Sequence, residues 1–496
     1  MKLMEHVELA IVGGGPVGLL LAAEAGRYGI RTTVMETETA IADQPKANTL
    51  HARAIQSLVR CGYAAALPPG RDAPGNAVSF HFAGLDGLTI RAPEHEPTPL
   101  AKCPQADLER VFEEHARAKG VQILRGHRAT HIRRTRDRVH LAVRSGHDEH
   151  RISADYVAAA DGAHSFIREQ IGFTKDFHAP RISVLLGVVR FADPASAPAG
   201  WHRSRRGWTV ARDFGDGYTL IRAITFTGTP PDRRAPVTVE DLQREASYIL
   251  GRDLKITETL HLRRFSDVAM LAHRFIDGRI ALVGDAAHTH FPIGGQGLST
   301  GIQDALNLGW KLAHCIRGTA GKGLLETYDK ERRPAASRVI DNTRAQTALM
   351  RPDPELDPLR ALFTELIRQD QGRGHLSGAI SAQDTRYPPR LKGASAWEGR
   401  FLENLMLMRS DGRPTDVVEL LAAGRPLLLL SEPEADSTYR TQSQAWDSVV
   451  STVTVQPRSG LPCDALLLRP DGYVAWASDS ADPLPEALRV WFGDGP

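Results

Sequence analysis

The chain of 496 residues is 42% hydrophobic and 24% charged, a balance typical of a globular protein with room for about two to four domains. Its 61 basic and 59 acidic residues leave a net charge of +2, which argues against a nucleic-acid binder and against attraction to a membrane. The four cysteines lie far apart without a C-x-x-C pair, which argues against a disulfide framework and favours a cytoplasmic location.

The first predicted unit is a β-α-β fold built on a glycine turn. Val7–Val12 forms a buried strand, Pro16–Tyr28 has apolar residues at helical spacing, and Thr32–Met35 is again a strand. Between the first two, Gly13–Gly18 fits G-x-G-x-x-G, and Glu36 follows the second strand. Small residues let a pyrophosphate approach the helix N-terminus, and the carboxylate can accept hydrogen bonds from ribose hydroxyls. This context predicts a site for FAD or NAD rather than NADP.

Further helices and strands continue the α/β pattern as far as about residue 180, where the sequence changes to short apolar runs. Helices are predicted at Leu50–Arg60 and Gln105–Lys119, and a strand at Tyr156–Ala160 is followed by a helix that starts at Ser165. From Arg181 to Phe226, short apolar runs alternate with Gly, Asp and Pro clusters. That texture predicts an antiparallel sheet inserted into the first domain.

A second glycine-rich block follows a buried strand at Arg279–Val283. Asp285 stands at the end of that strand, where a carboxylate can bind a polyol hydroxyl, and glycines continue to Gly301. We expect His288 to be a structural histidine. Helices are predicted at Ile302–Cys315 and Leu324–Leu349, and the last hundred residues, with their own strand-like runs, are long enough for a further small domain.

Three motifs together resemble those of single-component, FAD-dependent aromatic hydroxylases of the para-hydroxybenzoate hydroxylase type. They are the glycine turn with Glu36, the D-G-x-x-S-x-x-R run Asp161–Arg168, and the block that begins at Gly284. Asp304–Ala313 and Leu325–Pro334 extend the resemblance over the first two-thirds of the chain.

The tail narrows the resemblance to one branch of this family. Leu467–Trp476 is similar to the thioredoxin-like domain of phenol hydroxylase, rifampicin monooxygenase and aromatic-polyketide hydroxylases. That domain normally lacks a redox dithiol, and here Cys463 is the tail's only cysteine.

The resemblance therefore implies an α/β fold: a Rossmann-like FAD-binding domain, an inserted antiparallel β substrate domain and a thioredoxin-like C-terminal domain. The expected boundaries are 1–180 and 275–385 for the FAD-binding domain, 181–274 for the substrate domain, with a contribution from 76–102, and 390–496 for the C-terminal domain.

The resemblance also assigns residues to non-covalently bound FAD. Pro292 is expected beside the flavin ring, and no catalytic side chain is assigned beyond it. Lys46 stands where Arg is usual, so bidentate phosphate pairing is lost. Ser299 replaces the usual Asn, which is silent if only the backbone amide matters and loosens the flavin if the side chain holds the loop. The full set is Gly13, Gly15, Val17, Gly18, Glu36, Thr37, Lys46, Arg53, Gln105, Ala129, Asp161, Asp285, Pro292, Gly297, Leu298 and Ser299.

The implied reaction is hydroxylation of an aromatic compound by NADPH or NADH and O2 through a flavin hydroperoxide. A bulky polycyclic phenol, antibiotic or polyketide is the expected substrate. Two alternatives stay open: a Baeyer–Villiger or epoxidising monooxygenase, and a non-catalytic binding protein on the same fold. No metal, nucleic acid or membrane is expected as a partner, and the protein is expected to be a monomer or homodimer.

Overall fold

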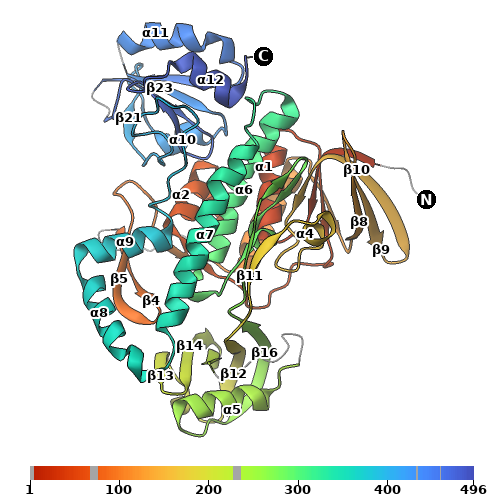
Figure 1. Ribbon diagram of the computed structural model, residues 1–496, viewed down its shortest axis with the longest axis vertical. Helices are drawn as coiled ribbons and strands as arrows, with labels where there is room; N and C mark the ends of the chain where they lie inside the picture. Colours follow the sequence, from red (N-terminus) through yellow and green to blue (C-terminus); the bar gives the residue numbers. More distant parts are fainter. Residues whose placement is uncertain (1–4, 68–75, 227–235, 432–433, 458–459, 496) are drawn as a thin grey trace.

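The computed structural model describes residues 5–67, 76–226, 236–431, 434–457 and 460–495. Figure 1 shows three parts: a central sheet with its helices, a five-stranded sheet at the bottom, and the C-terminal tail at the top. The long helices α6 (Gly297–Arg317) and α7 (Glu326–Leu349) lie between the tail and the five-stranded sheet. Among the described helices, none is long and apolar enough to cross a membrane.

The central sheet is parallel over five strands in the order β7-β2-β1-β10-β19, with β18 antiparallel at one edge. Its strands are nearly continuous apolar runs because both faces are covered. The hairpin β8–β9 pairs antiparallel with β10. The bounds are β1 Glu5–Val12, β2 Thr32–Glu36, β7 Gln122–Arg125, β8 Arg128–Arg134, β9 Val139–Ser145, β10 Asp148–Ala159, β18 Ile276–Asp277, β19 Ile280–Leu282, α1 Pro16–Arg27, α3 Gln105–Ala118 and α4 Phe166–Ile171.

Helices α2 (Ala52–Arg60) and α6 start at other residues than predicted, each for a reason visible in the packing. Helix α6 begins at Gly297 rather than at Ile302, since its early glycines are required by packing: a Cβ at Gly301 would lie 2.6 Å from Val17 Cγ2 of α1. Close packing of two helices outweighs the low helix propensity of glycine. Helix α2 starts later than predicted, because β3 (Thr49–His51) pairs with β6 (Leu100–Lys102).

The region after residue 181 forms an antiparallel sheet, as its texture predicted. The strand order is β13-β14-β15-β12-β16, and helix α5 packs on one face through Leu242 and Ala246. The other face, through Trp208 and Ile224, joins a cluster with Phe82 of β4. The bounds are β4 Ala77–Phe82, β5 Leu85–Arg91, β12 Ser183–Phe191, β13 Gly200–Ser204, β14 Gly207–Gly215, β15 Tyr218–Thr225, β16 Ile256–Ser266 and α5 Val239–Leu250.

The tail has a four-stranded sheet in the order β24-β23-β25-β26, in which only β23 and β24 are parallel. Both faces are buried, and Trp310 of α6 packs into the cluster on one of them with Leu428 and Trp491. The bounds are β21 Met406–Met408, β22 Pro414–Asp416, β23 Leu427–Ser431, β24 Ser451–Val455, β25 Ala465–Leu468, β26 Val474–Ala477, α10 Val417–Leu421, α11 Glu434–Ser443 and α12 Leu484–Phe492.

The remaining elements connect these parts. Strands β11, β17 and β20 form a small antiparallel sheet next to α7, and α8 and α9 pack on β5. Their bounds are β11 Lys175–His178, β17 Ala269–Ala272, β20 His288–Thr289, α8 Asp357–Arg368 and α9 Asp370–Ser381.

Candidate active site

The glycine turn after β1 combines tight packing with one open position. A Cβ at Gly13 would lie 2.2 Å from the Ala160 oxygen, and one at Gly18 would lie 2.1 Å from the Gly13 oxygen. At Gly15 the same Cβ would have nothing within 4 Å. Gly15 is also the N-cap of α1, which no side chain caps. Unpaired N–H groups at a helix N-terminus beside open space form a binding site for an anion.

The Glu36 carboxylate is held at the end of β2. The Gly14 N–H donates to its Oε2 at 2.5 Å, and the Glu38 N–H donates to its Oε1 at 2.8 Å. Each carboxylate oxygen keeps a further lone pair for a ligand hydroxyl. Thr37 is exposed beside it.

Asp285 lies at the start of the second glycine-rich block, in the short turn Gly284–Ala286. It is exposed to water, yet desolvation by the surrounding protein raises its pKa. No donor within the described part of the chain binds it. Val17 lies 3.3 Å from the Cβ position of the preceding Gly284, so the start of α1 is adjacent to this acid.

Helix α6 supplies a second uncapped N-terminus, at Gly297, Leu298 and Ser299. The buried Ser299 hydroxyl accepts a hydrogen bond from the His51 N–H at 3.0 Å. His51 Nε2 in turn donates to the Gly294 oxygen at 2.7 Å, and burial lowers the pKa of His51 to about 4, so its ring is neutral. The Ser299 side chain therefore connects β3 to the start of α6. The sequence had left open whether a side chain at this position holds the loop, and this bond shows that it contributes.

The loop before α6 requires two consecutive glycines. Gly294 and Gly295 have φ of +76° and +65°, which other residues rarely adopt, and they follow the exposed Pro292. Gly295 also lies against Thr49 of β3, 3.2 Å from its Cβ position. His51 and Thr49 were missed by sequence reasoning, because only tertiary pairing of β3 brings them to this loop.

Comparison with known proteins gives full-length matches. The profile described as "FAD binding domain" matches residues 6–343, and the one described as "Aromatic-ring hydroxylase, C-terminal" matches residues 395–495. A 12-dehydrotetracycline 5-monooxygenase/anhydrotetracycline 6-monooxygenase of Streptomyces rimosus is 34% identical, covering 98% of this chain and 99% of the relative. A rifampicin monooxygenase of Streptomyces venezuelae is also 34% identical, over 98% of both chains. The chain belongs to the FAD-dependent aromatic-ring hydroxylases.

Solved structures agree with this assignment. CabE, an aromatic hydroxylase from angucycline biosynthesis, superposes with a TM-score of 0.90 at 30% identity, covering 99% of this chain and 100% of CabE. The cofactor of this hydroxylase is FAD, with NAD(P)H as the usual co-substrate of the family. The residues present fit FAD: two adjacent uncapped helix N-termini suit its diphosphate, and the unpartnered Asp285 suits its hydroxyls.

Three further residues predicted to bind FAD lie on α3, on β8 and in the loop before β3. Gln105 starts α3, where its N–H donates to the Ala47 oxygen at 3.0 Å and its side chain donates to Glu109 at 2.7 Å. Lys46 is exposed in the adjoining loop, and Ala129 is buried on β8.

The described contacts of Arg53 are with the segment that precedes the first strand of the C-terminal tail. Its Nη2 donates to the Gln383 oxygen at 2.8 Å, and its guanidinium stacks on the Phe401 ring, 3.7 Å from the centroid. Arg53 therefore contacts the segment between α9 and β21 of the tail.

The Asp161–Arg168 run of the hydroxylase forms a hydrogen-bonded turn that also contacts the Asp285 block. The Ser165 side chain caps α4 by accepting from the Arg168 N–H at 3.0 Å, and Asp161 Oδ2 accepts from the Ile167 N–H of the first turn at 3.1 Å. Arg168 is buried and donates to the oxygens of Ala163 and Ala286, both at 3.0 Å. The second bond joins this turn to the Asp285 block, which gives the motif a structural reason besides any contact with FAD.

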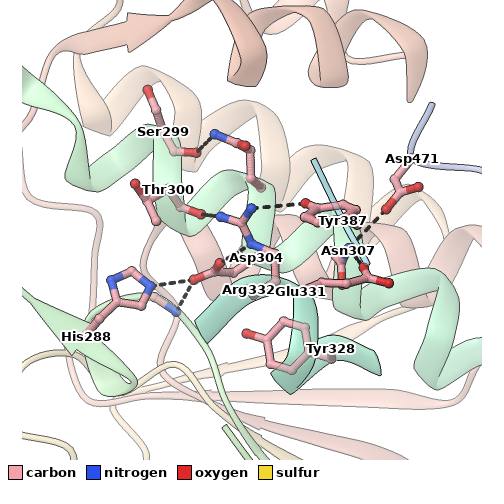
Figure 2. Close-up of polar contacts among 12 residues, drawn as sticks. His288, Ser299, Thr300, Asp304, Asn307, Tyr328, Glu331, Arg332, Tyr387 and Asp471 are labelled. Carbon is pink, nitrogen blue, oxygen red and sulfur yellow. Dashed lines mark hydrogen bonds and ion pairs between the residues drawn. The ribbon is translucent and has the colours of Figure 1, made fainter. Parts of the chain in front are cut away.

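Behind the Asp285 block lies a buried polar network, shown in Figure 2. Asp304 of α6 accepts from the Gly284 N–H at 3.3 Å and contacts His288 Nε2 at 2.6 Å. Arg332 Nε of α7 donates to Asp304 at 2.7 Å, and its Nη1 donates to the Tyr387 hydroxyl at 3.0 Å. His288 is thus held structurally, as the sequence indicated.

The same network continues into the tail. Glu331 accepts from Lys311 at 2.7 Å and from both terminal nitrogens of Arg469 at 2.8 and 2.9 Å. Arg469 also pairs with Asp471, at 2.5 Å. Burial alone would raise the pKa of Glu331, but Arg469 and Lys311 outweigh it and lower the pKa to about 2. Within the described residues, no group of three or more His, Cys, Asp or Glu could hold a metal ion.

Proposed function

We propose that this hydroxylase uses NADPH or NADH and O2 to hydroxylate a bulky polycyclic phenol, of the kind named for its tetracycline and rifampicin relatives. Bound FAD supplies the activation of O2 and the transfer of one oxygen atom to an electron-rich ring. The observation that carries the proposal is the meeting of two uncapped helix N-termini with Asp285 in a chain matched over its full length.

In this proposal the chain binds and orients FAD through residues from both blocks. The amides at Gly15 and Val17 bind the pyrophosphate, and Glu36 accepts from the adenosine ribose. Asp285 accepts from ribityl hydroxyls. The amides of Leu298 and Ser299 contact the flavin pyrimidine. Gly13, Gly18 and Gly297 support these by close packing, and Thr37, Lys46, Gln105, Ala129, Asp161 and Pro292 stay predicted contacts. The position of Arg53 favours a structural role.

A large cavity supports a bulky substrate. Its volume is about 1250 Å³, and Phe177, Phe226, Tyr248 and Phe291 contribute aromatic surface to its lining. Phe291 directly precedes Pro292, which is expected beside the flavin ring. A polycyclic compound in this cavity would reach the loop before α6 and exclude water from it.

The test is a screen of polycyclic phenols for stimulated NAD(P)H oxidation by the purified yellow protein. We expect oxidation to be slow alone, to rise with a fitting phenol and to yield a product one oxygen heavier. Ring connectivity of that product separates hydroxylation from epoxidation or Baeyer–Villiger insertion. A protein that copurifies without flavin and does not take up added FAD would contradict the proposal.

We further propose the domain division expected from the sequence. The strand order β24-β23-β25-β26, with one parallel pair, supports a thioredoxin-like tail, and the five-stranded antiparallel sheet supports an inserted substrate domain. The four free cysteines support a cytoplasmic location. We propose a monomer or homodimer, which light scattering would decide.

A further inference from the structure

Three cations come together where the five-stranded sheet faces β3 and β6. Arg212 lies on β14 and Arg222 on the neighbouring β15, while Lys102 ends β6. In the strand register Arg212 is opposite Leu220 and Arg222 is opposite Val210, so the two arginines are diagonal neighbours on one face. Both act electrostatically on Lys102. We call these three residues the cation group.

The hydrogen-bond partners of the cation group among the described residues are neutral. The Asn48 side-chain oxygen, with the amide oriented to satisfy both its ends, accepts from the two terminal nitrogens of Arg212 at 2.8 and 2.9 Å. Lys102 Nζ donates to Thr49 Oγ1 at 2.9 Å. Within the described ranges, Arg222 has no hydrogen-bond partner, and no carboxylate lies within ion-pair distance of any member of the group.

The surroundings make this arrangement unfavourable without a ligand. Leu186, Val188 and Leu220 form a buried apolar cluster on the sheet. Desolvation lowers the pKa of Lys102 and of Arg212, and that of Arg222 to about 10, although water reaches all three side chains. Among the described residues, the charged groups that lower these pKa values further are other members of the cation group. The group therefore has the charge and the hydrogen-bond donors to bind an anion.

The position of the group indicates which anion. Thr49, which binds Lys102, lies against Gly295 in the loop beside Pro292. Phe226, which lines the large cavity, directly follows the end of β15 at Thr225, and Arg222 lies on that strand. The cation group does not line the cavity itself but lies beside the Pro292 loop, toward which a ligand in the cavity would extend.

We propose that Lys102, Arg212 and Arg222 bind an ionised oxygen of the substrate, a phenolate, enolate or carboxylate. The proposal deepens the proposed function and rests on it. Three cations would hold such an oxygen in its ionised form, which makes an attached aromatic ring more electron-rich. The residues position and polarise the substrate and transfer no group themselves.

The test measures binding rather than turnover, so that its failure is distinct from a failure of the proposed reaction. Equilibrium dialysis with FAD-loaded protein compares alizarin, an acidic polycyclic phenol, with its dimethyl ether. We expect the wild type to prefer alizarin and to bind it more tightly as the phenol ionises. Arg222→Gln and Arg212→Gln should each weaken alizarin binding about 10- to 100-fold and leave the ether unchanged.

Two control variants sharpen the result. Arg222→Lys keeps the charge and should retain most of the affinity. Arg190→Gln removes an arginine of the same sheet that lies 3.7 Å from Glu258, and should have no effect. Circular dichroism reports whether each variant is folded, and absorbance separately gives its FAD content.

Other outcomes would overturn the proposal. Equal alizarin binding by wild type and both Gln variants would do so, as would a wild type that does not prefer alizarin to its ether. If instead the variants lost affinity for NADPH but not for NADH, the cation group would bind a nicotinamide phosphate. Loss of FAD with unchanged alizarin preference would assign the group to the cofactor.

Discussion

Two clusters of charged side chains in the protein differ in charge balance and in burial. The network around Glu331 joins three carboxylates (Asp304, Glu331, Asp471) to three cations (Lys311, Arg332, Arg469), all almost fully buried. The cation group of Lys102, Arg212 and Arg222 has no carboxylate among its described neighbours, and water reaches it.

This difference separates charges used for the fold from charges left for a ligand. A buried pair offsets its own desolvation only when its partners are in place, so the balanced network is complete without any ligand. An unbalanced group stays partly hydrated until a counter-ion arrives. Asp285 is the acidic counterpart of the cation group, an exposed carboxylate that no described donor binds.

The largest expected effect is on the balanced network. Arg469→Met should lower the free energy of unfolding by about 3–5 kcal/mol, because Glu331 and Asp471 lose their common partner inside the protein. Urea denaturation followed by circular dichroism measures it. Arg489→Met, at an exposed residue of the same tail, is the control and should change stability by less than about 1 kcal/mol. Equal effects of the two substitutions would show that the buried network stabilises the fold no more than an exposed arginine does.

Acid should weaken the same network. The folded-state pKa of Glu331, at about 2, lies below its ordinary value of 4.5, so its contribution is full above pH 4.5 and disappears as the pH falls toward 2. The whole loss amounts to about 3 kcal/mol. Glu331→Gln should therefore show a shallower decline of stability over this window, measured by urea midpoints at a series of pH values. An unchanged slope would contradict the assignment, and Glu403→Gln, at an exposed site, serves as the control.

Asp285 is the carboxylate that no described donor binds, and its loss should affect FAD binding rather than stability. Asp285→Asn should weaken FAD binding by about 1.5–3 kcal/mol, since charge-assisted hydrogen bonds to the cofactor become neutral ones. Flavin content after gel filtration and titration of the apoprotein with FAD measure the change. Cys463→Ser, in the tail, should leave both unchanged. If both variants bound FAD with the same affinity, Asp285 would not be part of the FAD-binding site.

The smallest effect is expected at Ser299. Ser299→Ala leaves the buried His51 N–H without its acceptor and should cost about 1 kcal/mol of stability, visible as a small shift in the urea midpoint. Ser299→Asn restores the residue usual in the family and should recover flavin affinity if a side chain at this position holds the loop. A stability gain in the alanine variant would show that the bond is dispensable.

Much of the fold was predictable because its signals are local. The strand, glycine turn and helix at residues 5–27 follow from periodicity and glycine spacing, as does the texture of the antiparallel sheet. The start of α6 was missed because it depends on how Gly301 packs against Val17 of another helix. The local pattern at the glycines indicated a loop.

The candidate site was predictable only where its residues share a motif. Glu36 and Asp285 lie at strand ends beside glycine turns, and their roles stay predictions. The cation group could not be found in this way, since Lys102, Arg212 and Arg222 come from three strands and meet only through folding. The direction of Arg53 likewise depends on carbonyl groups more than three hundred residues away in the chain.

The bond between Glu331 and Arg469 sets a limit on engineering. The tail is joined to α7 by a charge pair from which water is excluded, and to α6 by Trp310, so the two sides must be exchanged as a matched unit. A chimera that takes its tail from a relative should fold only if the donor supplies an arginine and an aspartate at positions 469 and 471. Without them, Lys311 and Glu331 would be inherited with half of their partners, and the junction would have to be redesigned from both chains together.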